Sequence, residues 1–188
     1  MDRKVNVKSL QEVYENYMDK EGWGDKGTLH SYIEIYDKYM EKKDNISILE
    51  IGVQKGHSIR MWQDYFQNSK VYGIDVTLNN VIFDQLENVY VCDGTDEDAV
   101  NATLGDLKLD YVVDDGSHLI EHQIKSFDII WPRIKTGGRY FIEDVNGDEA
   151  IKAIGDHFTN LGLNYTLIDH RHLKGRYDDI VMFVEKNV

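Results

Sequence analysis

Cysteine and proline are almost absent from this sequence, which has one of each, Cys92 and Pro132. A single cysteine excludes a framework of intramolecular disulfides and fits a reducing compartment, so we expect a cytoplasmic location. No run approaches the roughly 20 apolar residues that a membrane helix needs, and the N-terminal stretch is too polar for a signal peptide. Because linker-like and low-complexity stretches are also lacking, the 188 residues predict one compact globular domain.

Basic residues are scarce relative to acidic ones, with 21 Lys and Arg against 34 Asp and Glu, a formal net charge of -13. Binding to nucleic acid depends on Lys and Arg side chains that neutralise phosphates. No basic cluster with interleaved aromatic residues is found in the sequence. A nucleic acid partner is therefore disfavoured, as is a membrane, and a small-molecule ligand is expected.

Short apolar runs alternate with segments of helical periodicity along the chain. The runs predict strands over 46–51, 71–76, 89–92, 109–113, 139–142, 165–168 and 180–184. The periodicity predicts helices over 10–40, with a break at 23–27, and over 58–66, 96–104, 120–131 and 147–161. Such alternation indicates an α/β fold, a mostly parallel sheet with helices on both faces. A loop without a helix joins the last two strands, which can therefore pair antiparallel. Residues 1–44 are expected to form a helical cap segment on a domain spanning 45–188.

The first predicted strand runs into a glycine turn in which Gly52 and Gly56 are four positions apart. In open α/β sheets, ligands bind beyond the carboxyl ends of the strands, where Gly52 lets a ligand approach the backbone. The spacing is not the GxGxxG of a pyrophosphate-binding turn, so it favours a nucleoside without phosphate, such as S-adenosylmethionine. Asp75, at the end of the second strand, can accept hydrogen bonds from ribose hydroxyls. Glu50, Asp75 and Asp93 follow three strands, and their crowding is costly unless they meet ligand donors. A turn without any ligand is the alternative.

A second polar cluster follows the fourth and fifth strands. Residues 114–118 read DDGSH, and Glu143 and Asp144 end the next strand. Three carboxylates, Asp115, Glu143 and Asp144, suit a hard divalent cation such as Mg²⁺, which takes oxygen ligands. His118 is the natural general base, since an imidazole titrates near neutral pH, and Asp115, three positions earlier, could face the same substrate.

Each part of this cluster also has a simpler interpretation. Asp-Gly-Ser is a common turn sequence, and Glu143-Asp144 could cap the following helix. Residues 118–122, HLIEH, fit a zinc-peptidase pattern that requires both histidines on one helical face. A metal-dependent hydroxylase or hydrolase and a protein that binds a cofactor without catalysing a transfer are the alternatives that the cluster leaves open.

With these motifs, the chain resembles class I S-adenosylmethionine-dependent methyltransferases, and more narrowly the macrocin O-methyltransferase family and its cephalosporin-hydroxylase-like relatives. The segments that carry the resemblance lie within about 25–145, and DDGSH followed by GGRYFIEDV is the most specific. The resemblance implies a Rossmann-like seven-stranded sheet in the order 3-2-1-4-5-7-6, with strand seven antiparallel. It also implies O-methylation of a small-molecule hydroxyl, on a sugar or other vicinal diol.

The resemblance assigns roles to individual residues. The family's motifs imply that Asp115, Glu143 and Asp144 hold the metal and that His118 deprotonates the substrate. Similarity of the glycine turn to catechol O-methyltransferase implies that Ser58 lies near the methionine carboxylate of the cofactor. The remaining implied cofactor-binding residues are Glu50, Gly52, Gly56, Asp75, Asp93, Gly94 and Asp114.

Two departures from the family pattern bear on the substrate. The family usually carries an insertion after the IED motif, whereas here 146–148 lead almost directly into a helix. A large auxiliary N-terminal domain found in some members is also missing from this sequence. We therefore expect an open site, which a homodimer could cover. Residues 25–36 resemble a family segment that closes over the cofactor, although an amphipathic helix packed on the sheet is the alternative.

Overall fold

The computed structural model describes residues 8–16, 24–41, 44–83 and 86–187. Seven strands form one sheet in the order β3-β2-β1-β4-β5-β7-β6. All neighbouring pairs are parallel except β5 with β7 and β6 with β7, which are antiparallel. The strands are β1 (Ser47–Ile51), β2 (Lys70–Asp75), β3 (Val89–Val91), β4 (Leu109–Asp114), β5 (Ile134–Ile142), β6 (Tyr165–Asp169) and β7 (Ile180–Glu185). The predicted strand order and antiparallel last strand are confirmed.

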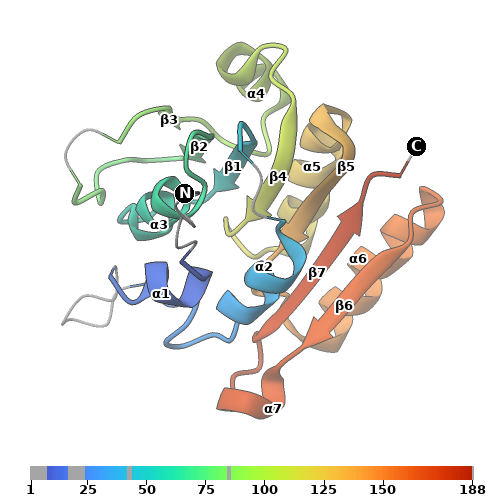
Figure 1. Ribbon diagram of the computed structural model, residues 1–188. Helices are drawn as coiled ribbons and strands as arrows, with labels where there is room; N and C mark the ends of the chain where they lie inside the picture. The colour runs from blue at the N-terminus through green and yellow to red at the C-terminus, as the bar shows by residue number, and fades with distance from the viewer. Residues whose placement is uncertain (1–7, 17–23, 42–43, 84–85, 188) are drawn as a thin grey trace, which may run out of the picture.

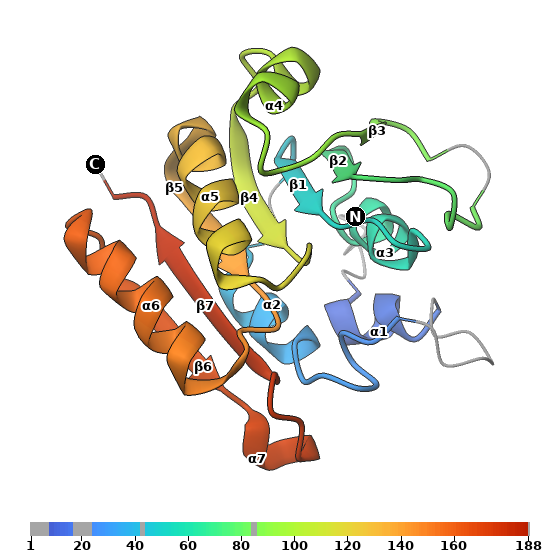
Figure 2. The ribbon, with the colours of Figure 1, turned by 180° about the vertical axis from the view of Figure 1, so that it is seen from behind.

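Helices cover both faces of the sheet (Figures 1 and 2). One face carries α1 (Leu10–Tyr14), α2 (Ile33–Tyr39) and α3 (His57–Tyr65). The other carries α4 (Glu97–Leu104), α5 (Ile120–Ile130), which runs into the short 3-10 turn η1 (Trp131–Arg133), and α6 (Gly147–Asn160). None of the described helices is long and apolar enough to cross a membrane.

The central strands are buried on both faces, which explains their continuous apolar sequences. Side chains of β1 alternate between two hydrophobic cores, with Ile48 facing α1–α3 and Leu49 facing α4–α6. Side chains of α1 and α2, among them Leu10 and Ile33, belong to the first core, in which Trp62 and Tyr36 pack edge to face. The N-terminal helices are therefore packed against the sheet by the same core that holds α3.

Three predictions about individual elements were wrong. β5 begins at Ile134 rather than Arg139, because the Gly137–Gly138 pair lies within the strand, beside a shift in its register with β4. The connection between β6 and β7 contains a helical turn, α7 (Arg171–Lys174), which ends at left-handed Gly175. Only α1 and α2 are helical within the described part of 10–40, and Trp23, in the predicted break, lies outside the described residues.

The carboxyl ends of β1, β2, β4 and β5 meet at one edge, and backbone hydrogen bonds continue past the strands. The Gly52 amide donates to the Ile74 carbonyl, the Asp115 amide to the Ile51 carbonyl, and the Glu143 amide to the Asp114 carbonyl. These bonds hold the glycine turn, the DDGSH loop and the Glu143-Asp144 pair side by side, as the sequence predicted.

Candidate active site

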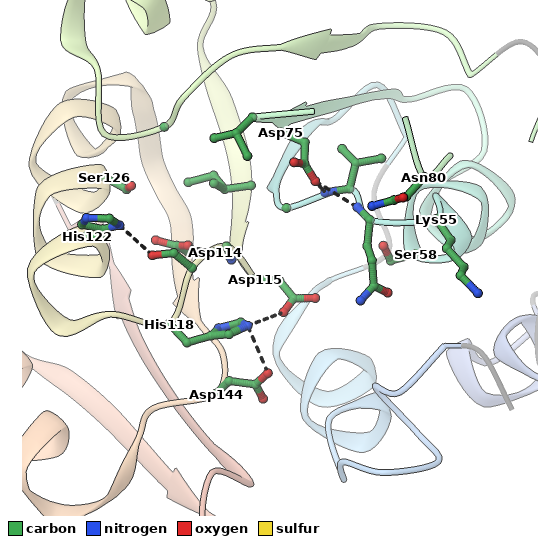
Figure 3. Close-up of a pocket in the computed structure, with 18 of the residues that line it drawn as sticks. Lys55, Ser58, Asp75, Asn80, Asp114, Asp115, His118, His122, Ser126 and Asp144 are labelled. Atoms are coloured by element: carbon green, nitrogen blue, oxygen red, sulfur yellow. Dashed lines mark hydrogen bonds and ion pairs between the residues drawn. The ribbon is translucent and has the colours of Figure 1, made fainter. Parts of the chain in front are cut away.

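A cavity of about 470 Å³ opens at this edge, between the glycine turn and the DDGSH loop (Figure 3). The predicted cofactor residues that line it are Gly52, Ser58, Asp75, Asp93, Gly94 and Asp114. Asp115, His118 and Asp144 lie at its other end, so the cavity joins the two predicted clusters. Glu50, Gly56 and Glu143 are not among the lining residues.

The glycine turn is held from two sides. Gly52 has a φ of +89°, and a Cβ atom there would lie 2.0 Å from the Asp115 carbonyl oxygen. Asp75 accepts hydrogen bonds through Oδ2 from the amides of Val53 (2.8 Å) and Gln54 (3.0 Å). The carboxylate thus shapes the turn while it lines the cavity, where its remaining lone pairs could accept from a diol.

Glu50 and Gly56 support the turn from outside the cavity. Glu50 is completely buried, and its nearest cation is the Lys26 ammonium at 3.2 Å. Burial raises the pKa of Glu50 to about 7, against the opposing effect of Lys26. Gly56 is the left-handed N-cap of α3, and a Cβ there would lie 2.7 Å from the Leu86 side chain.

Asp93 and Gly94 form the far wall of the cavity. The Asp93 carboxylate accepts from the amide and the hydroxyl of Thr95, both at 2.8 Å, and these bonds lower its pKa. Gly94 packs closely, since a Cβ would lie 3.1 Å from Ile51 and 3.3 Å from the Ser126 hydroxyl. The absence of a side chain at Gly94 therefore lets the backbone line the cavity directly.

Two carboxylates converge on His118 at the near end of the cavity. Its Nε2 lies 3.9 Å from Asp115 Oδ1 and 3.6 Å from Asp144 Oδ2 (Figure 3). Ligand atoms of the three residues all lie within 4.8 Å of one another. His118 and Asp144 both have left-handed backbones, with φ of 56° and 50°. Non-glycine residues rarely adopt this conformation, and such strain is concentrated at functional sites.

The Glu143 side chain points away from Asp115, Asp144 and His118 and into the protein interior. It is 1% exposed, accepts a hydrogen bond from the Tyr36 hydroxyl, and lies 2.6 Å from the Lys26 ammonium. The structure therefore brings Asp115, Asp144 and His118 together, and places Glu143 behind them among side chains of the N-terminal segment.

The N-terminal segment supplies donors to the acids that sequence analysis did not assign. Tyr32 donates its hydroxyl to Asp144 Oδ1 at 2.6 Å, and His30 Nδ1 lies 3.1 Å from the same oxygen. Lys26 and His30 are four positions apart, as are Tyr32 and Tyr36. Polar side chains that recur at helical spacing in a segment whose other periodic residues are apolar were the sequence signal for these donors.

The second histidine of the zinc-peptidase pattern does not join the first. His122 Nδ1 lies 2.8 Å from the Ser117 hydroxyl, whereas His118 faces Asp115 and Asp144. Among the described residues, no cluster with metal-ligand spacing contains His122. The geometry therefore does not favour a zinc peptidase.

Asp114 is a buried carboxylate with an unusual titration. It accepts from the Tyr140 hydroxyl at 3.0 Å, and burial raises its pKa to about 7. Because the folded pKa lies above the unfolded value of about 4, the folded state binds this proton more tightly. The resulting stabilisation is complete below about pH 4 and is lost as the pH rises through about 7.

We therefore expect Asp114→Asn to gain stability relative to the wild type when the pH rises from 6 to 8, by roughly 1 kcal/mol. Urea unfolding at both pH values measures the difference. Asp156→Asn, which changes an exposed aspartate on α6, is the control for loss of one charge. An equal difference between Asp114→Asn and wild type at both pH values would contradict the raised pKa.

The groups that the resemblance implies can be tested against this geometry. The glycine cradle, the Asp75 carboxylate that lines the cavity and the lack of a side chain at Gly94 suit a nucleoside, which requires close backbone approach. The carboxylate oxygens of Asp115 and Asp144 are hard donors that suit Mg²⁺, and the imidazole of His118 lies beside them. The residues therefore fit both S-adenosylmethionine and a divalent cation.

A seven-stranded sheet in this order, with a cavity at the carboxyl ends of β1, β2 and β4, is the Rossmann-like fold of class I S-adenosylmethionine-dependent methyltransferases. The MycE methyltransferase of the mycinamycin pathway, solved in complex with Mg, SAH and mycinamycin VI, shares it. The TM-score is 0.72 at 24% sequence identity, over 97% of this chain and 54% of that one.

Sequence comparison with curated proteins finds O-methyltransferases as well. The chain is 32% identical over 79% of its length to the 8-demethyl-8-alpha-L-rhamnosyl tetracenomycin-C 2'-O-methyltransferase of Streptomyces olivaceus. It is 30% identical over 85% of its length to the demethylmacrocin O-methyltransferase of Streptomyces fradiae. The chain spans 43% and 44% of these two proteins, less than half. No protein-family model matches it. The chain therefore belongs to the family of macrocin-type O-methyltransferases, within the class I S-adenosylmethionine-dependent methyltransferase fold.

Proposed function

We propose that this protein is an S-adenosylmethionine-dependent and Mg²⁺-dependent O-methyltransferase that acts on a hydroxyl of a small molecule, a sugar or other vicinal diol. The observation that carries the proposal is the convergence of Asp115, Asp144 and His118 at one end of the cavity whose other end is formed by the glycine turn. The names of the relatives, which are sugar O-methyltransferases of natural-product pathways, support the choice of acceptor.

Each part of the site has a role in this proposal. Bound S-adenosylmethionine would supply an electrophilic methyl group, and a divalent cation held by Asp115 and Asp144 would polarise the acceptor hydroxyl. Gly52 and Asp75 would hold the cofactor, and His118 Nε2 would take the proton of the acceptor hydroxyl. His118 is 37% exposed at its side chain, so an acceptor can reach it from solvent.

The test is a methyl-transfer assay with a panel of acceptors that carry rhamnosyl and other deoxysugar groups, read by mass spectrometry. We expect one methyl group to be added to an acceptor with adjacent hydroxyls. EDTA should lower transfer by about 100-fold, since metal polarisation is worth several kcal/mol, and added Mg²⁺ should restore it.

Transfer that is insensitive to EDTA would contradict the metal role. Tight binding of S-adenosylmethionine without transfer to any acceptor would instead favour a cofactor-binding protein without transferase activity. Calorimetry with S-adenosylhomocysteine separates the two results, because it measures cofactor binding without an acceptor.

A further inference from the structure

A lysine ammonium lies at the centre of the buried acids. Lys26 is 4% exposed at its side chain, and its Nζ lies 2.6 Å from Glu143 Oε2, 2.7 Å from Asp115 Oδ2 and 3.2 Å from Glu50 Oε1. Lysine is seldom buried unless it is paired. Three carboxylate oxygens around one point make the environment that a hard metal ion also takes, and here a side chain of the protein fills it.

The carboxylate oxygens are divided between this ammonium and the cavity. Asp115 accepts a hydrogen bond from Lys26 through Oδ2, and its Oδ1 lies toward His118. Asp144 accepts a hydrogen bond from the Tyr32 hydroxyl through Oδ1, and its Oδ2 lies toward His118. Within the described parts of the chain, Asp115 and Asp144 thus each present one oxygen to the imidazole.

Glu143 presents neither of its oxygens to the cavity. Oε2 is held by Lys26, and Oε1 accepts from the Tyr36 hydroxyl. Its backbone carbonyl is also occupied, by the Gln123 amide at 2.9 Å. The residue that sequence motifs place among the metal ligands is therefore committed to protein donors in the structure.

The position of Lys26 is fixed by bonds from the other end of the chain. The Lys174 ammonium donates to the carbonyls of Gly27 (2.8 Å) and His30 (2.5 Å). Ser31 donates through its amide and its hydroxyl to Asp179, both at 2.9 Å. The Lys26 carbonyl itself accepts from the Tyr32 amide at 2.8 Å. A divalent cation could reach Glu143 Oε2 only by displacing the Lys26 ammonium from this anchored segment.

We propose that Lys26 is a resident cation of the site, which occupies the Glu143 side of the acidic cluster and confines a divalent cation to Asp115 Oδ1 and Asp144 Oδ2, beside His118. The inference rests on the proposed function for the use of that cation, although the binding test needs no activity. Lys26 is a positioning residue in this scheme, because it acts through the carboxylates of Asp115 and Glu143.

The test uses Mn²⁺ as the probe, with binding to the full chain measured by electron paramagnetic resonance in the absence of cofactor and acceptor. We expect one Mn²⁺ per wild-type chain. Asp144→Asn should weaken binding by at least about tenfold, because it removes a ligand oxygen, whereas Glu143→Gln should change it by less than about twofold. Both variants keep Lys26, so this pair gives a result whether or not Lys26 can be replaced.

The second arm removes the ammonium. Lys26→Met should tighten Mn²⁺ binding by at least about tenfold and make it depend on Glu143, because the uncovered carboxylates then accept the divalent ion. The double variant K26M/E143Q should return binding to the wild-type value. Lys152→Met, which removes an exposed lysine on α6, is the matched control and should leave Mn²⁺ binding as in wild type.

Three results overturn the inference: Glu143→Gln as damaging as Asp144→Asn, a folded Lys26→Met with wild-type Mn²⁺ affinity, or a wild type that binds no Mn²⁺. Folding of each variant is checked by circular dichroism. A wild type that binds Mn²⁺ as expected but transfers no methyl group overturns only the proposed function and leaves the role of Lys26 supported.

Discussion

His118→Asn lowers methyl transfer by about 10²–10⁴-fold and leaves the affinity for S-adenosylhomocysteine within about twofold, if His118 is the general base. Asparagine is the sharper substitution than alanine, because the backbone φ of 56° lies in the left-handed region that asparagine tolerates. The variant therefore keeps the DDGSH loop in place while it removes the proton acceptor. The measurement is turnover of an acceptor from the panel beside calorimetric titration of the cofactor.

The control for this variant is His172→Asn, which changes an exposed histidine on α7. Full turnover in the His118 variant would contradict a base role. A parallel loss of cofactor affinity would show that His118 supports the cofactor cavity instead. Mn²⁺ binding gives a third readout, since loss of metal from His118→Asn would make the imidazole a ligand rather than a base.

Gly52→Ala is expected to abolish cofactor binding and to destabilise the fold by about 1–3 kcal/mol. The added Cβ would lie 2.0 Å from the Asp115 carbonyl oxygen and 2.7 Å from its carbon, both backbone atoms that cannot rotate away. The glycine turn and the DDGSH loop must then separate, and the cavity loses the wall between them. Urea unfolding and cofactor calorimetry measure the two effects.

Gly162→Ala separates the clash from backbone strain. Gly162 also has a left-handed φ, +72°, but nothing lies within 4 Å of the Cβ position. Both variants lose stability because alanine is strained in a left-handed backbone, and only the Cβ of Gly52→Ala collides with the opposite loop. Equal destabilisation of the two, with cofactor binding kept by both, would contradict the contact between the turn and Asp115.

The sequence predicted the sheet well because each central strand is buried on both faces and reads as a short apolar run. β5 was misplaced at its start since Gly137 and Gly138 usually mark a turn, and only pairing with β4 extends the strand through them. The single turn of α7 was missed because four residues carry no usable periodicity.

For the site, motif spacing brought Asp115 and Asp144 to the right edge, but it could not assign the direction of each carboxylate. Glu143 and Asp144 are adjacent in sequence, and the left-handed backbone at Asp144 turns one toward the cavity and the other toward Lys26. The spacing of Lys26 and His30 could mark polar residues on this segment, but it could not identify the partners of the ammonium, which come from three strand ends distant in the chain.

The bonds between the N-terminal segment and the β6–β7 connection also bear on how the protein reaches its active form. Ser31 and Asp179 are 148 positions apart, and Lys174 and His30 are 144 apart. Contacts between such distant residues form late, since the loop they close costs entropy before the contact offsets it. The cofactor turn, whose partners lie within about 65 positions of it, can assemble earlier. During refolding, cofactor binding should therefore recover before the arrangement of Asp144 and His118 does.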